Sequence, residues 1–150
     1  MSIDWSLKDT AAARAALDLT VTREVALAEV LAWIGDFAAG ITGTITETEA
    51  PSWEYKEKAA RAVVDEAATA EQTAVLAAEA AETGETVAEL AGFIIDRADR
   101  FRLVQARLTG FRRRAQSQFD AASSALEIGA AKASILSDAE TFAAAVRAAR

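Results

Sequence analysis

An apolar stripe runs from Val87 to Leu126 without a proline. Its members recur every three or four residues, the spacing that keeps side chains on one face of an α-helix. They are Val87, Leu90, Ile94, Ala98, Phe101, Val104, Leu108, Phe111, Ala115, Phe119, Ala122 and Leu126. A helix of this length would extend about 60 Å, about twice the diameter of so small a domain. We therefore expect other helices, or another subunit, to cover the stripe, which indicates assembly rather than chemistry.

The composition favours an all-α fold. Alanine supplies 39 of the 150 residues, and there is one proline. Alanine is the best helix former because it loses no side-chain entropy in a helix. Its methyl group buries little area, however, so helices lined by alanine gain less hydrophobic stabilisation per residue. We predict an elongated helical bundle with coiled-coil-like packing that is stabilised further by oligomerisation.

The chain is predicted to comprise an N-terminal helical segment (1–40), an extended loop (41–52) and a helical bundle domain (53–150). The first helix is expected to end near Ala39, with Gly40 as a left-handed cap. Its predicted stripe is Leu17, Val21, Val25, Ala28, Leu31, Ile34, Ala38 and Ile41. The β-branched residues within 19–22 are a candidate break. The loop is also rich in β-branched residues, and a short strand is the alternative there.

Helix starts are predicted where Ser or Thr precedes Glu or Gln by three residues, the capping-box pattern. These pairs are Thr69 with Gln72, Thr86 with Glu89, Ser124 with Glu127, and Ser137 with Glu140. They predict a short helix ending at Thr83-Gly84, one long central helix over about 86–122, and two short C-terminal helices. Within the long helix we expect Gly110 to allow another helix to approach closely, with a break as the alternative.

The charges are unevenly distributed. Residues 96–114 contain seven arginines and two aspartates, whereas residues 47–90 contain eleven acidic side chains and three basic ones. The acidic segment is expected to fold back on the basic helix or to guide a partner. The carboxylates Glu47, Glu49, Glu54 and Glu57 are interpreted as a solvated helix start rather than a metal site or a glycosidase pair.

Several function classes are disfavoured. The chain has no cysteine and no histidine, which removes thiolate chemistry and the commonest general base. Three consecutive arginines, 112–114, point about 100° apart around a helix, so they favour ion pairing within the protein over nucleic-acid binding. We expect neither a signal peptide nor a membrane-spanning run, and we expect the chain to be cytosolic when made. We expect no enzyme activity, cofactor or metal, and no membrane partner.

The most distinctive string is PSWEYKEKAARA, residues 51–62. Pro51 suits the first turn of a helix, and Glu57 lies four residues before Arg61, a favourable helical pair. Trp53 shares an apolar face with Ala60. We expect Trp53 to anchor this short helix, which ends near Glu66, on the long one.

This string follows an Ile41-Thr42-Gly43 turn and precedes an arginine-rich helix. Together they resemble small tail proteins of tailed bacteriophages and prophages, of the tail-fibre assembly or baseplate-associated type. Further matching features are residues 83–86, 90–94 and 110–113, so that the resemblance covers about residues 40–125. It implies a non-enzymatic structural component of the tail tip, baseplate or fibre-attachment region.

The resemblance also implies where the protein acts and with what. The expected partners are other phage tail proteins and further copies of the chain, in the virion tail and, during assembly, in the host cytoplasm. A tail-fibre assembly chaperone absent from the mature virion is one alternative. A cellular helical adaptor protein is the other.

The candidate partner-binding or packing residues come from two sources. The resemblance supplies Trp53, Lys56, Glu57 and Arg61, and the apolar stripe supplies Phe101, Leu108, Phe111, Phe119 and Leu126. We expect helices over 53–81 to cover the stripe near Phe101 to Phe111. The remainder, towards Phe119 and Leu126, is expected to meet a neighbouring subunit.

Overall fold

The computed structural model describes residues 5–42 and 50–149, and within them the protein is all helical, as predicted. The helices are α1 (Trp5–Thr42), α2 (Ala50–Val64), α3 (Ala70–Thr83), α4 (Val87–Ala121) and α5 (Ala125–Ala148). No strand occurs in these two ranges. The predicted long helix over 86–122 corresponds to α4. It is not the single long helix, because α1 has 38 residues and α4 has 35.

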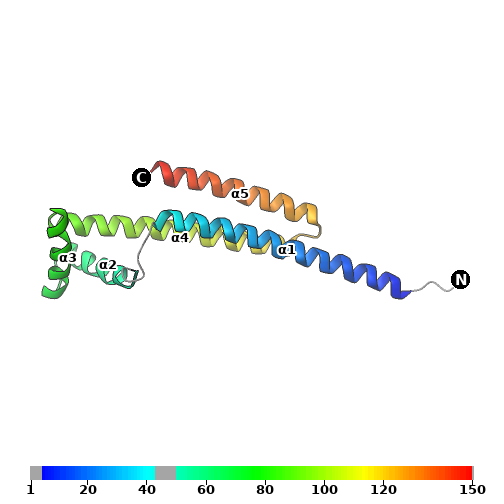
Figure 1. The fold of residues 1–150 in the computed structure, drawn as a ribbon, viewed down its shortest axis with the longest axis horizontal. Helices are drawn as coiled ribbons and strands as arrows, with labels where there is room; N and C mark the ends of the chain where they lie inside the picture. Colours follow the sequence, from blue (N-terminus) through cyan, green and yellow to red (C-terminus); the bar gives the residue numbers. More distant parts are fainter. Residues whose placement is uncertain (1–4, 43–49, 150) are drawn as a thin grey trace. The chain divides into compact units, whose positions relative to one another are not determined.

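The helices form two compact units. One combines α1, the part of α4 from Arg107 onward, and α5; Figure 1 shows these three segments side by side. The other combines α2, α3 and α4 up to Ala106. We refer to them as the α1–α4–α5 unit and the α2–α3–α4 unit. The predicted segments, 1–40, 41–52 and 53–150, follow chain order, whereas the first unit joins helices from both ends of the chain.

Most of the long apolar stripe is buried. Its buried members are Leu90, Ile94, Val104, Leu108, Phe111, Ala115, Phe119 and Ala122. The α2–α3–α4 unit packs Leu90 and Ile94 against Ala59, Ala60, Leu76, Ala80 and Ala91. In the α1–α4–α5 unit, the buried residues of α1 and α5 are Ala26, Val30, Phe37, Ile128, Ile135, Ala139 and Ala143. One helix therefore supplies a face to two separate cores.

The predicted capping boxes of α3 and α4 are confirmed. At Thr69 the hydroxyl accepts a bond from the Gln72 N–H at 3.2 Å, and the Gln72 side chain accepts one from the Thr69 N–H at 2.9 Å. Thr86 and Glu89 repeat this exchange. Gly84 closes α3 as predicted, in the left-handed conformation with φ 77°. These local signals fix both ends of the α3–α4 connection.

The C-terminal part of the chain is one helix rather than two. Ser124 caps α5 as predicted, since its hydroxyl accepts a bond from the Glu127 N–H. The predicted second start at Ser137 is wrong, because α5 continues through it and Thr141 donates its hydroxyl to the Ser137 carbonyl at 3.0 Å. The Ser137–Glu140 pattern alone does not interrupt a helix whose apolar face stays buried.

The N-terminal helix also differs from expectation. It is continuous through Thr20 and Thr22, whose hydroxyls donate to carbonyls four residues earlier and so find acceptors within the helix. Gly40 does not cap it, because α1 extends to Thr42. The ends of the predicted loop 41–52 are helical, and residues 43–49 of that loop lie outside the described ranges.

The expected close approach at Gly110 is wrong. A methyl group added to Gly110 would meet no atom within 4 Å, and α4 is continuous there. Neither the close contact nor the alternative break occurs. The glycine lies on the exposed side of α4.

Candidate interaction site

The Trp53–Arg61 string lies on α2 and faces α3 and α4. The Arg97 guanidinium of α4 lies over the Trp53 ring, 5.2 Å from its centroid, an attractive cation–π geometry. Lys56 forms an ion pair with Glu79 of α3, with Nζ and Oε2 2.6 Å apart. Trp53 thus contacts the long helix, as expected, and Lys56 joins α2 to α3.

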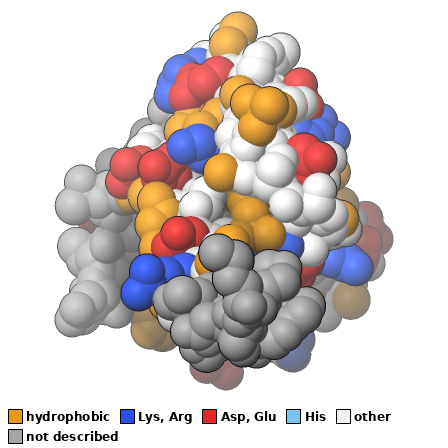
Figure 2. Space-filling view, turned by 90° about the vertical axis from the view of Figure 1, so that its right-hand side faces the viewer, with side chains coloured by type: hydrophobic (Ala, Val, Ile, Leu, Met, Phe, Trp, Pro, Cys, Tyr) orange, Lys and Arg blue, Asp and Glu red, His pale blue; other side chains and the backbone are white. Residues whose placement is uncertain are grey.

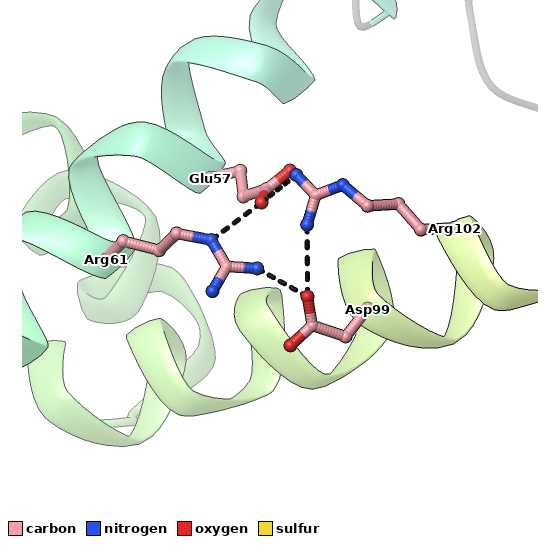
Figure 3. Close-up of polar contacts among 4 residues, drawn as sticks. All are labelled: Glu57, Arg61, Asp99 and Arg102. Atoms are coloured by element: carbon pink, nitrogen blue, oxygen red, sulfur yellow. Dashed lines mark hydrogen bonds and ion pairs between the residues drawn. The ribbon is translucent and has the colours of Figure 1, made fainter.

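Four side chains connect α2 to α4 through a closed polar network (Figure 3). Glu57 Oε1 accepts a bond from Arg61 Nε at 2.8 Å and another from Arg102 Nη2. Asp99 Oδ1 accepts from Arg102 Nη1 at 3.0 Å and from Arg61 Nη2. Each arginine therefore bridges both carboxylates. We call these four residues the Glu57 network.

The network shifts the pKa values of Glu57 and Arg61. The hydrogen bonds that Arg102 and then Arg61 donate to Glu57 hold the pKa of that carboxyl below its ordinary value, and partial burial opposes them only in part. The Glu57 and Asp99 carboxylates raise the pKa of Arg61. Glu57 is thus held as an ion-paired carboxylate. This arrangement joins helices rather than leaving a free general base.

The Glu57 network also tests the charge pattern. Glu57 belongs to the acidic segment and Arg102 to the basic one, and the two are ion-paired. The predicted fold-back of acidic on basic sequence is confirmed for this pair. The sequence identified Glu57 with Arg61 from their spacing. It did not identify Asp99 and Arg102 as partners. Asp99 lies 38 positions after Arg61, and Arg102 lies 45 positions after Glu57, so no local sequence pattern connects them.

An aromatic cluster lies in the α1–α4–α5 unit. Trp33 stacks on Phe37 with ring centroids 5.2 Å apart. Phe142 of α5 meets Phe37 and Phe111 edge-on, each at 6.0 Å. The Trp33 indole N–H donates to Glu140 at 2.5 Å. Phe111 is therefore covered by α1 and α5, which corrects the expectation that the helices over 53–81 cover it.

Arginines cover the margin of this cluster. Arg107 lies over Phe111 and Phe142, Arg147 lies over Phe37, and Arg114 lies over Phe111 at 5.9 Å. Arg114 also forms an ion pair with Asp138 of α5 at 2.8 Å. This use of Arg107 and Arg114 agrees with the interpretation of the basic run as internal pairing and covering.

The remaining candidate residues of the stripe have different environments. Leu108 and Phe119 are buried by the chain itself, 2% and 1% exposed. The expectation that Phe119 meets a neighbouring subunit is therefore corrected. Phe101 is 39% exposed and Leu126 is 84% exposed. Leu126 does not continue the buried face of α4, because α4 ends at Ala121 and Leu126 belongs to the first turn of α5.

Helix α1 has apolar residues on two opposite faces. One face contributes Ala26, Val30 and Phe37 to the core. Successive residues of a helix turn by about 100°, which places most of the predicted α1 stripe on the opposite side. That side consists of Leu17, Val21, Val25, Ala28, Leu31 and Gly35, and we call it the outer face of α1. The sequence therefore showed the apolar positions of the predicted stripe but did not identify Ala26, Val30 and Phe37 as the face that meets the core.

The outer face of α1 is exposed. Its four large side chains, Leu17, Val21, Val25 and Leu31, are between 41% and 62% exposed. Figure 2 shows hydrophobic side chains at the surface of the molecule, interspersed with charged ones. A single exposed apolar side chain is ordinary, whereas here two leucines and two valines are exposed along one helix face.

The described residues offer little for a small ligand. An open hollow of about 260 Å³ lies in the α1–α4–α5 unit, lined by Thr20, Arg23, Glu24, Leu27, Gln116, Phe119 and Asp120. Its side chains carry both charge signs. Within the described ranges, no three acidic, histidine or cysteine side chains gather as metal ligands would. None of the helices, as far as they are described, is long and apolar enough to cross a membrane.

Comparison with known proteins gives no match to this chain among family models, curated proteins or solved structures.

Proposed function

We propose that this protein is a non-enzymatic assembly component of a bacteriophage tail, at the tail tip, the baseplate or the fibre-attachment region. The observation that carries the assembly role is the outer face of α1. A helix that is apolar on both sides is normally buried on both. Here the chain covers one side and leaves the other open.

The tail assignment rests on the resemblance of the Trp53–Arg61 string to small tail proteins. In the structure, Trp53, Lys56, Glu57 and Arg61 all contact α3 or α4 of the same chain or pair with each other. Their proposed role is therefore to hold the α2–α3–α4 unit together. The surfaces proposed for partners are the outer face of α1 and the exposed side chains of Phe101 and Leu126.

The proposed partners are other tail proteins and further copies of this chain, joined by coiled-coil-like helix contacts. The proposed location is the virion tail, reached from the host cytoplasm. The role requires no cofactor, metal, nucleic acid or membrane.

Mass spectrometry of purified tailed particles tests this function. We expect the protein in stoichiometric amounts in particles from cells that encode it, and tails that lack the tip, baseplate or fibres when its reading frame is deleted. Absence from the particle combined with a loss of fibres would identify a fibre chaperone instead. Neighbouring reading frames that encode no tail proteins would contradict the proposal and favour a cellular adaptor.

A further inference from the structure

The outer face of α1 is complementary to itself. Leu17 and Gly35 are 18 residues apart, five turns of an α-helix, so they lie on the same side. A methyl group added to Gly35 would meet no atom within 4 Å, so the space above it is open. The same face therefore carries a large side chain near one end and an open position near the other.

A second α1 running in the opposite direction matches these features in pairs. When Leu17 lies opposite Gly35 of a second copy, Val21 lies opposite Leu31 and Glu24 lies opposite Ala28. All three pairs are centred on residue 26. A two-fold axis repeats each contact, because in a symmetric dimer residue i contacts j while j contacts i. Leu17 and Glu24 then each face a small residue, and Val21 packs against Leu31 along the helix pair.

The charges on this face also favour opposite directions. Arg14 and Asp36 are exposed, and neither forms an ion pair within the described part of the chain. In the antiparallel register Asp36 of one copy lies midway between Arg14 and Asp18 of the other copy, so that Arg14 lies near both carboxylates and offsets their mutual repulsion. In a parallel pair in register, Glu24 would face Glu24 and Arg14 would face Arg14. Such like-charge contacts disfavour the parallel arrangement.

We propose that two copies of this protein associate through the outer face of α1 as an antiparallel helix pair centred on residue 26. Val25 of each copy meets its equivalent beside the two-fold axis. The pair extends from Arg14 to Asp36, about 33 Å of helix. This inference deepens the proposed assembly role by naming the partner and surface for self-association.

Light scattering on the full chain tests whether this surface is used. We expect a dimer that dissociates on dilution through the micromolar range, because a single helix pair is at the small end of specific interfaces. The Val21→Glu/Leu31→Glu double variant should be monomeric at concentrations where the wild-type protein is dimeric. The matched control is Leu103→Glu, since Leu103 is 73% exposed but lies on α4, and it should leave the dimer intact.

Cross-linking tests whether the two α1 helices run in opposite directions. The chain has no cysteine, so a single introduced cysteine is unique. Proteins carrying Leu17→Cys and Gly35→Cys are mixed and treated with a short thiol cross-linker. The antiparallel register predicts a mixed cross-linked dimer. It predicts no dimer from Leu17→Cys alone, because the two equivalent positions are about 27 Å apart along the helices.

Each result decides between the proposals. A monomer at all concentrations, a dimer that persists in Val21→Glu/Leu31→Glu, or efficient cross-linking of Leu17→Cys to itself would overturn the α1 pair. Any of these results together with the protein in tail particles leaves the assembly function standing on another surface. The predicted dimer without tail particles would instead overturn the tail assignment alone.

Discussion

The two units of the molecule each pack three helical segments, but with different side chains. The core cluster of the α2–α3–α4 unit has seven buried members, four of which are alanines, and none is aromatic. The α1–α4–α5 unit buries the phenylalanines Phe37, Phe111 and Phe119 together with branched aliphatic residues. Because burial energy follows apolar area, the second core gains more per residue than the first.

The arginines of the two units show this contrast in part, since Arg97 also lies over Trp53 in the first unit and Arg114 also pairs with Asp138 in the second. In the α2–α3–α4 unit, Arg61 and Arg102 pair with carboxylates across α2 and α4. In the α1–α4–α5 unit, Arg107 and Arg114 lie over aromatic rings. An alanine-rich core fixes the spacing of helices but offers few shaped contacts, so polar contacts at its margin specify how the helices align. The aromatic core specifies its own alignment.

The largest effect is expected for Phe119→Ala. This ring is 1% exposed, and truncating a buried phenylalanine costs about 3–5 kcal/mol. Urea unfolding should show this loss, and hydrogen exchange should accelerate in α1 and α5. The control Leu126→Ala removes a side chain that is 84% exposed and should change stability little. A loss below about 1 kcal/mol for Phe119→Ala would contradict the description of this core.

The next largest effect is expected for Leu76→Ala in the α2–α3–α4 unit. Leu76 is fully buried and is the largest side chain that α3 contributes to its core. We expect a cost of about 2–5 kcal/mol, with faster hydrogen exchange in α2 and α3 but not in α5. Val75→Ala, at a more exposed neighbouring position, is the control. Equal acceleration in α5 would show that the two units unfold together.

A smaller gain is expected when the exposed glycines of α4 are replaced by alanine. Gly92 lies in the part of α4 that belongs to one unit and Gly110 in the part that belongs to the other. Both positions have open space, so Gly92→Ala and Gly110→Ala should each stabilise the protein by about 1 kcal/mol in thermal or urea unfolding. A loss of stability for Gly110→Ala would show that another helix does approach there.

Gly84→Ala is the counterpart of these variants. Gly84 has φ 77°, a conformation that an alanine adopts at a cost of about 1 kcal/mol or more. The same substitution should therefore destabilise the protein here, although the space around Gly84 is equally open. Because all three glycines have open space around them, a loss of stability for Gly84→Ala alone would show that its backbone conformation, and not packing, requires glycine.

The helical class and most helix ends were predictable because they depend on local physics. The capping pairs at Thr69, Thr86 and Ser124 bond within four residues, as does the left-handed Gly84. The same reasoning failed at Ser137, a start signal, and at Gly40, a stop signal, because each lies inside a helix that continues. A pattern that permits a helix end does not require one.

The partners of each face were less predictable. The period and composition of the sequence showed that α1 carries many apolar side chains. These side chains are divided almost equally between two opposite faces, so the local sequence does not determine which face packs into the core. Phe111 was expected to be covered by helices over 53–81 because they are close in sequence and opposite in charge. Its actual neighbours, Trp33 and Phe142, are distant in sequence on either side. The spacing of Trp33 and Phe37, about one helical turn, is the sequence signal that would have indicated this aromatic face, although neither residue belongs to the predicted stripe.

The smallest effect is expected from the Glu57 network, and it tests whether polar contacts align the α2–α3–α4 unit. Exposed ion pairs contribute about 0.2–1 kcal/mol each. We expect Arg102→Ala to lower stability by no more than about 1 kcal/mol and to accelerate hydrogen exchange in α2. Arg113→Ala, which removes an exposed arginine that forms no ion pair among the described residues, is the control.

The pH dependence sharpens this last test. The pKa of Glu57 is lowered in the folded protein, so its contribution is complete above the ordinary glutamate value of about 4.3 and is lost as the pH falls through the lower folded pKa. Glu57→Gln should therefore reduce the fall in melting temperature below that pH. The matched control is Glu54→Gln, which removes a carboxylate of the same helix that forms no ion pair among the described residues. The pKa values of Glu89 and Glu127 are also lowered, by hydrogen bonds from Thr86 and Ser123. Because these two carboxyls are still present in Glu57→Gln, the melting temperature of that variant should still fall in acid, but by less. An unchanged acid profile in Glu57→Gln would mean that the alanine core aligns these helices without the network.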